Sequence, residues 1–326
     1  MFVTVTLNKK AVKKIIIALS AALFAILIAI YCRGHESINT AANTSSDKKF
    51  IKWLEFNASY EALYDSMQCD IQTNTDEYPV SQVDILAYLA SKYGNDFSRY
   101  SKKDVDAFML RIKNGESIED ICTSKYFDYY RQAYGAVIGN FLNDRKDGGY
   151  GLNVYSPIAY GFDWNHYKDF GASRSYGFKR KHLGNDILGS IGTPIIAVED
   201  GTVEALGWNR YGGWRIGIRS FDKKRYYYYA HLRKGHPYVK TLKEGDTVNA
   251  GQVIGYLGMT GYSTKENVNN INIPHLHFGM QIIFDESQKD GNGEIWIDVY
   301  NIVELLKQNS SKVIKNTQTG EYEVTN

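Results

Sequence analysis

The 326-residue sequence predicts an α+β multidomain protein with an N-terminal transmembrane helix, a small all-α region and an antiparallel β-sheet domain. Three observations lead to this fold class. An uncharged apolar run stands near the N-terminus, apolar residues then recur at helical spacing, and short Gly-rich alternating segments follow after residue 150. The predicted parts are a cytoplasmic tail, a transmembrane helix, a linker, a helical domain, a β-rich domain and a disordered tail, at 1–14, 15–32, 33–47, 48–145, 146–308 and 309–326.

The N-terminal segment has the charge pattern of a membrane anchor. Four lysines between residues 9 and 14 precede the uncharged, almost wholly apolar run 15–31. At about 1.5 Å per residue, a helix of this length just spans a hydrocarbon core of about 30 Å. Positive charge before the run predicts a cytoplasmic N-terminus and an extracytoplasmic remainder. The alternative is a cleaved signal peptide, but the nearest small-residue cleavage site, at 40–42, lies well past the run.

Composition limits the other function classes. A net charge of +2 and a pI near 8.2 are far from the profile of a nucleic-acid-binding protein. Three cysteines do not make a disulfide framework, and we expect Cys69 and Cys122 to be buried thiols that could pair if oxidised. Lipidation of Cys32 is not expected, because Tyr31 is bulkier than the residue usual before a lipidated cysteine.

Residues 48–145 are predicted to form a small helical bundle. Apolar residues recur at helical spacing in 51–62 and 83–90, and further helices are predicted at 104–112, 117–121 and 126–142. Ser101 is the expected N-cap of the third helix. This region shows no repeat, metal pattern or nucleophile constellation, so we expect it to space, dock or cover the β-rich domain. A muramidase-like domain is the alternative, but no isolated catalytic Glu supports it.

The β-rich domain carries repeated turn signals. Val198–Val203 and Lys243–Val248 each place a glycine turn before a β-prone residue, which predicts antiparallel hairpins. A terminal helix is predicted at 298–307. The polar composition of the last residues, 309–326, predicts the disordered tail.

Two motifs in this domain contain most of a metal site. His275 and His277 stand two residues apart in a β-prone segment, so their side chains point to the same face. His182 and Asp186 would add nitrogen and oxygen ligands, and the intervening Gly184 favours a tight loop over a helix. With no Cys nearby, three protein ligands and an open fourth position are typical of catalytic zinc.

The histidine distribution supports a common site over unrelated polar residues. Only seven His occur, and five of them lie between His182 and His277. His231 ends an aromatic, β-prone run at 226–229 and is a further candidate. His35, His166 and His236 are expected to be solvated or structural.

Taken in order, the motifs of residues 176–278 resemble the lysostaphin-type zinc endopeptidases of peptidoglycan, peptidase family M23. The segments that carry the resemblance are 182–186 (HLGND), 192–197 (GTPIIA), 200–203 (DGTV), 207–213 (GWNRYGG), 229–232 (YAHL), 245–248 (GDTV), 251–255 (GQVIG), 260–264 (TGYST) and 274–278 (PHLHF). The resemblance implies a zinc metalloendopeptidase that hydrolyses peptide bonds of peptidoglycan in a groove of duplicated-hairpin, β-sandwich-like sheet. The charge pattern of the N-terminal segment adds the expectation that this enzyme is membrane-anchored.

The resemblance also implies roles for individual residues. His182, Asp186 and His277 would be the ligands of Zn²⁺, and His231 and His275 the catalytic pair that orients water, moves its proton or stabilises charge. Tyr176, six residues before His182, is a candidate oxyanion donor or else a packing tyrosine.

The chain departs from the family pattern at residues 265–273. This Asn-rich insertion separates the Ser-Thr pair from the Pro-His-Leu-His strand and is predicted to form a surface loop on the rim of the groove.

Two other function classes remain open on sequence. A non-catalytic membrane-anchored scaffold of the same fold would usually lack a ligand, and none is missing here. A biotinyl- or lipoyl-carrier domain would need a modified Lys at a hairpin tip, and none is evident.

Overall fold

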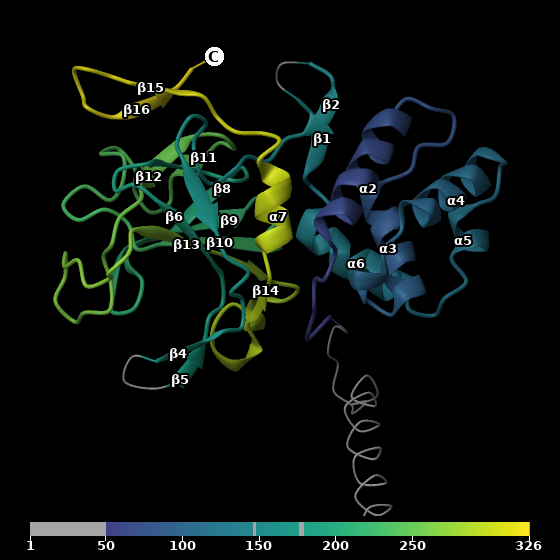
Figure 1. Ribbon diagram of the computed structural model, residues 1–326, viewed down its shortest axis with the longest axis horizontal. Coiled ribbons are helices and arrows are strands. Elements are labelled where there is room, and N and C mark those ends of the chain that lie inside the picture. The colour runs from purple at the N-terminus through teal and green to yellow at the C-terminus, as the bar shows by residue number, and fades with distance from the viewer. Residues whose placement is uncertain (1–49, 146–147, 176–178, 326) are drawn as a thin grey trace, which may run out of the picture. The chain divides into compact units, whose positions relative to one another are not determined.

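The computed structural model describes residues 50–145, 148–175 and 179–325 (Figure 1). The predicted cytoplasmic tail, transmembrane helix and linker (1–14, 15–32 and 33–47) lie outside these residues, as does Tyr176. Among the residues that the structure describes, no helix is long and apolar enough to cross a membrane. Residues 50–326 form one compact unit.

The helical region holds most of the predicted helices. Its elements are α2 (Tyr60–Thr73), α3 (Gln82–Tyr93), η1 (Phe97–Arg99), α4 (Lys102–Lys113), α5 (Ile118–Ile121) and α6 (Phe127–Ile138). The helices predicted at 83–90, 104–112 and 117–121 are confirmed. Ser101 takes the N-cap position of α4 but makes no capping hydrogen bond, whereas the Ser117 side chain accepts the Asp120 amide at the start of α5.

The first predicted helix was wrong at its beginning. Residues 51–59 are not helical, and α2 begins at Tyr60, where the Ser59 side chain accepts the amide of Ala62 at 3.2 Å. Leu54, Phe56 and Ala58 are buried while the residues between them are exposed. The burial period is therefore two, and the helical spacing from residue 51 was coincidental. The predicted helix at 126–142 ends early, at Ile138.

The β-rich domain is built on an antiparallel sheet with the strand order β11-β8-β9-β10-β13-β6-β3, and β14 extends it beside β13. These strands are β3 (Trp164–His166), β6 (Asn185–Gly189), β8 (Gly201–Asn209), β9 (Gly213–Ser220), β10 (Arg225–Ala230), β11 (Thr247–Val248), β13 (His275–Ile282) and β14 (Ile295–Ile297). Smaller pairs are β4 (Ser173–Ser175) with β5 (Lys179–Lys181) and β7 (Pro194–Ile196) with β12 (Val253–Tyr256). The 3-10 helices η2 (Glu286–Gln288) and η3 (Gly291–Gly293) precede β14.

The helical region and the sheet share one hydrophobic core. The terminal helix α7 (Tyr300–Leu306), close to the predicted 298–307, lies between the sheet and the helices (Figure 1). The Asn301 side chain donates to the carbonyl of Ala58 at 2.8 Å, and that of Gln288 donates to the carbonyl of Ile51 at 2.8 Å. The hairpin of β1 (Leu142–Asp144) and β2 (Tyr150–Leu152) spans the predicted boundary at 145/146. The helical region is therefore docked onto the sheet.

The disordered tail was a wrong prediction. Residues 309–325 include a hairpin of β15 (Val313–Lys315) and β16 (Tyr322–Val324). The Glu321 carboxylate accepts hydrogen bonds from Tyr256 and from His236, and the Tyr322 amide donates to the Tyr256 hydroxyl at 3.2 Å. Polar composition hid this order because the contacts are made to partners distant in sequence.

Cys69 and Cys122 are free thiols, and burial raises the pKa of both.

A buried guanidinium fastens the helices to the sheet. Arg225 of β10 is fully buried and donates to the carbonyl of Ala136 in α6 at 2.7 Å. It also donates to both carboxylate oxygens of Glu199, at 2.7 and 2.8 Å, and Tyr227 donates to the same carboxylate at 2.7 Å. Each polar group in this buried network therefore depends on another member for its hydrogen bonds.

We expect Arg225→Met to lower the free energy of unfolding by about 3–5 kcal/mol, because it leaves the Glu199 carboxylate buried without its cation. Urea denaturation followed by circular dichroism measures this change. Arg111→Met is the matched control, since Arg111 makes its ion pair with Glu116 at the surface. Equal stability of the two variants would contradict the structural role of Arg225.

Candidate metal centre

Two adjacent antiparallel strands bring the predicted ligands together. In the β6–β13 register His277 lies opposite Asp186, and His275 lies opposite Leu188 on the same face of β13 as His277. His182 lies three residues before Asn185, the first residue of β6. Leu276 and Phe278, which alternate with the histidines, are fully buried in the core. The alternation of β13 therefore separates a metal-binding face from a core face.

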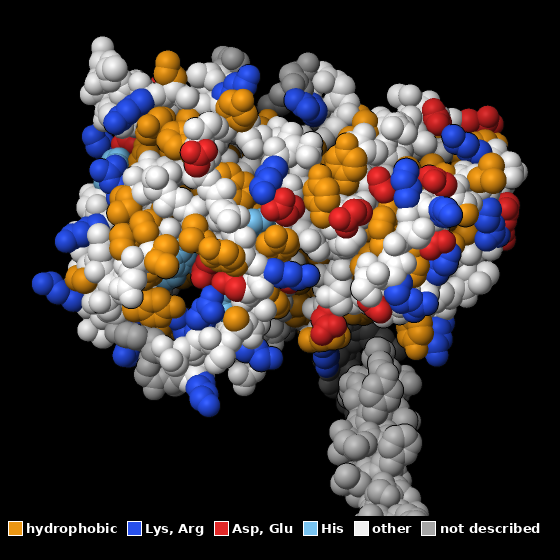
Figure 2. Space-filling view, viewed as in Figure 1, with side chains coloured by type: hydrophobic (Ala, Val, Ile, Leu, Met, Phe, Trp, Pro, Cys, Tyr) orange, Lys and Arg blue, Asp and Glu red, His pale blue; other side chains and the backbone are white. Residues whose placement is uncertain are grey.

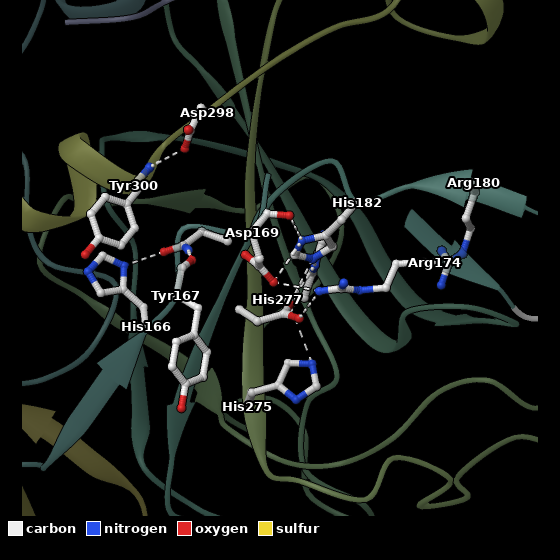
Figure 3. Close-up of polar contacts among 12 residues, drawn as sticks. His166, Tyr167, Asp169, Arg174, Arg180, His182, His275, His277, Asp298 and Tyr300 are labelled. Carbon is white, nitrogen blue, oxygen red and sulfur yellow. Dashed lines mark hydrogen bonds and ion pairs between the residues drawn. The ribbon is translucent and has the colours of Figure 1, made fainter. Parts of the chain in front are cut away.

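The three predicted ligands meet at one point (Figure 3). His182 Nε2 lies 2.8 Å from His277 Nδ1 and 3.0 Å from Asp186 Oδ1, and the third side, His277 Nδ1 to Asp186 Oδ1, is 3.2 Å. Donors around a tetrahedral zinc, at about 2.0–2.2 Å from the metal, lie roughly 3.3 Å apart. Two imidazole nitrogens and a carboxylate oxygen in such a triangle fit a zinc ion with a fourth position open.

Two residues that the sequence did not reveal surround these ligands. The Asp169 carboxylate lies 3.1 Å from His182 Nδ1, and the Asp169 carbonyl oxygen lies 3.1 Å from the same nitrogen. Arg174, in β4, donates to Asp169 Oδ2 at 2.6 Å and to Asp186 Oδ2 at 3.2 Å. Because Arg174 holds Oδ2, Oδ1 of Asp186 is left facing the histidines. Asp169 and Arg174 stand in loops or short strands, so no periodic pattern marks them.

The electrostatics of the site favour a bound cation. Burial lowers the pKa of His182, but its hydrogen bonds to Asp169 and Asp186 outweigh burial and raise that pKa to about 9. Burial raises the pKa of Asp186, but hydrogen bonds from His182 and His277 outweigh it and hold the pKa below its usual range. The Asp186 carboxylate is therefore ionised, and it supplies negative charge to the ligand triangle.

His231 reaches the site from the neighbouring strand. Ala230, the last residue of β10, pairs with His277, and His231 follows in the left-handed backbone region with φ of 63°. This conformation is uncommon for residues other than glycine. The His231 amide donates to the carbonyl of Gly212 at 2.7 Å, which helps to hold it. Its ring lies 4.9 Å from that of His275 and 5.8 Å from that of His277, centroid to centroid.

His231 and His275 have the same tautomer. His231 Nδ1 lies 2.9 Å from the Thr260 carbonyl oxygen and His275 Nδ1 lies 2.8 Å from that of Ile273. A carbonyl only accepts, so each Nδ1 carries the hydrogen and each neutral ring has its lone pair on Nε2. Burial, followed by the neighbouring His275 and His277, holds the pKa of His231 well below its usual value. His231 is thus a neutral base at physiological pH.

Close packing behind the ligands requires glycine at position 184. A Cβ added to Gly184 would lie 2.7 Å from His277 Cε1, 2.8 Å from His277 Nε2 and 2.7 Å from the carbonyl oxygen of Phe278. The tight loop predicted between His182 and Asp186 therefore serves to let the His277 ring approach the backbone.

The remaining histidines of the described region are structural, as predicted. His166 is buried between Asn185 and Glu304 and joins β6 to α7. His236 pairs with Glu321 of the C-terminal hairpin at 3.2 Å. In the space-filling view, histidine side chains appear at the surface of the part built from the sheet, among apolar and basic side chains (Figure 2).

Comparisons with known proteins find relatives among the peptidases. A model of peptidase family M23 matches residues 180–291. Over 167 residues the chain is 37% identical to the L-Ala–D-Glu endopeptidase of Bacillus subtilis, covering 50% of this chain and 49% of that protein. Over 102 residues it is 35% identical to the peptidoglycan DD-endopeptidase ShyC of Vibrio cholerae, covering 30% of this chain and 20% of that protein. The chain thus spans about half the length, or less, of these curated relatives.

One solved structure resembles more than the matched domain. It is a Ruminococcus gnavus protein named as a candidate glycyl-glycine endopeptidase, with a TM-score of 0.54 and 26% identity. The match covers 80% of this chain and 92% of that one. This share exceeds residues 146–308, so the likeness reaches into the helical region.

We expect Gly184→Ala to weaken zinc binding roughly 10–100-fold, because the added methyl group displaces the His277 ring. A competition titration with a chromogenic zinc chelator measures the affinity. Gly135→Ala is the matched control, since a Cβ there meets only Val83 Cγ1 at 3.7 Å. Wild-type zinc affinity in Gly184→Ala would contradict the packing argument.

Proposed function

Because residues 180–291 form a peptidase family M23 domain, we propose that this chain is a membrane-anchored zinc metalloendopeptidase that hydrolyses peptide bonds of peptidoglycan. The observation that carries the proposal is the convergence of three ligand atoms within 4.8 Å of one another, beside two histidines whose free Nε2 atoms can exchange protons. The names of the relatives support an endopeptidase acting on peptidoglycan, in its stem or its cross-bridge.

The metal requirement follows from the donor set. His182, Asp186 and His277 would hold the zinc ion, which would supply Lewis-acid polarisation of the scissile carbonyl and would lower the pKa of a water molecule. The Asp169 and Arg174 contacts keep the His182 ring and the Asp186 carboxylate aimed at this position before substrate arrives.

The two other histidines carry the proton transfers. His231 Nε2 and His275 Nε2 each present a lone pair, so either can take a proton from the attacking water. Once protonated, the same nitrogen can donate to the leaving amine or stabilise charge on the former carbonyl oxygen. His231 is buried and His275 is partly exposed, so solvent reaches the His275 ring more readily than the His231 ring.

The membrane assignment rests on the charge pattern of the N-terminal segment. The four lysines between residues 9 and 14 and the uncharged run 15–31 favour a single-pass anchor with the M23 domain outside the cell. Peptidoglycan also lies outside the cell membrane. The orientation predicted from the lysines therefore places the M23 domain on the same side as its proposed substrate.

We expect His231→Asn to keep about one equivalent of zinc but to lose roughly 10²–10⁴ of the cleavage rate, because a proton carrier is removed and no ligand. Asn tolerates the left-handed backbone at this position, so the fold survives.

His277→Ala should lose both zinc and cleavage. Plasma mass spectrometry gives the zinc content, and mass spectrometry of fragments released from purified peptidoglycan gives the activity. Retained zinc and cleavage in His277→Ala would refute the ligand assignment.

The topology is tested on intact cells stripped of their wall. Added protease should digest the chain beyond residue 47 and spare the N-terminal tail, as shown by antibodies to each part. Protection of the M23 domain, or a freely secreted form that begins near Asn43, would overturn the anchored topology.

A further inference from the structure

A second binding feature adjoins the two catalytic-candidate histidines. A pocket of about 390 Å³ opens beside Gly258, whose backbone pairs with His275. Arg233, Lys234 and Gly235, which follow His231 along the chain, also line it. A site of this size can hold part of a peptide. The pocket therefore lies beside the backbone segments that carry His231 and His275.

The insertion 265–273 builds the outer wall of this pocket. Asn267 and Asn269 line it. The Asn267 side-chain oxygen accepts hydrogen bonds from Trp214 Nε1 at 3.0 Å and from the Gly235 amide at 2.7 Å. Asn267 also has φ of 60°, a left-handed conformation that asparagine tolerates better than most residues. The wall is thus fixed to the body of the domain, as expected for a preformed site.

The charge of the pocket is positive and unbalanced. No acidic residue lines it. Within residues 50–145, 148–175 and 179–325, neither Arg233 nor Lys234 forms an ion pair with a carboxylate. By contrast Arg174 is paired with Asp169 and Asp186. Arg180, at the other side of the site, lies over the rings of Tyr211 and Tyr262.

We propose that this pocket is a carboxylate-binding subsite, in which Arg233 and Lys234 bind a free carboxylate on a peptide residue next to the scissile bond. A guanidinium pairs with a carboxylate through two parallel hydrogen bonds, and an ammonium adds a point charge. Ile191 and Met259, which also line the pocket, supply apolar contact beside the charge. The inference rests on the proposed function and deepens it, because it makes the enzyme selective for acidic peptides.

The test compares two synthetic stem peptides that differ only in one group, a free carboxylate or a carboxamide on the acidic residue. Calorimetry with the zinc-loaded full chain carrying His231→Asn measures binding without turnover. We expect the dissociation constant of the amide peptide to be about tenfold higher than that of the carboxylate peptide. With Arg233→Gln and Lys234→Gln added, the ratio should fall to about one. Lys265→Gln is the matched control, since it removes one exposed charge from the same insertion outside the pocket lining and should keep the ratio.

Two outcomes would overturn the subsite. One is equal binding of both peptides by the protein with Arg233 and Lys234 intact. The other is a preference that survives their replacement or is lost equally in Lys265→Gln, which would indicate a diffuse surface charge. Cleavage of purified peptidoglycan by the wild-type chain is measured in parallel. Carboxylate preference without cleavage would keep the subsite and refute the proposed hydrolysis, so the two failures are distinguishable.

Discussion

The pairing register of β6 with β13 is the constraint on which the metal centre depends. It places His277 opposite Asp186 and keeps His275 on the same face. A shift of one residue would turn both histidines toward the core and bring Leu276 and Phe278 to the surface. Several contacts oppose such a shift. Gly184 admits the His277 ring, and the Asn185 side chain bonds the Tyr167 carbonyl on one side and His166 on the other.

The pKa values of two neighbouring histidines, His182 and His231, are shifted in opposite directions. His182 faces two carboxylates, so it favours positive charge in spite of its burial. His231 is buried beside two further imidazoles, those of His275 and His277, and these effects outweigh its hydrogen bond to a backbone carbonyl, so it favours the neutral form. Residue identity and spacing alone could not reveal this difference, because it arises from the contact of His182 with Asp169 and from the burial of His231 beside His275 and His277, which the fold brings together.

The sequence predicted most helices and the residues that gather at the candidate metal centre, but not the structure that contacts between distant segments determine. His182, Asp186 and His277 could be found because two-residue spacing on a strand has a fixed geometric meaning. Asp169, Arg174 and Asn267 carry no such spacing, and their roles appear only when the strands pair. The extended residues 51–59 and the C-terminal hairpin were misjudged for the same reason, since both take their order from partners far along the chain.

The contacts between the beginning and the end of the compact unit have a consequence for its biosynthesis. Ile51 and Ala58 accept hydrogen bonds from Gln288 and Asn301, so these contacts join positions 237 and 243 residues apart. Closing so long a loop costs configurational entropy, and the cost is recovered only when the intervening sheet is complete. Helix α2, which follows these two residues, therefore cannot complete its packing against α7 until α7 has been synthesised. Until then the helical region cannot complete its docking onto the sheet.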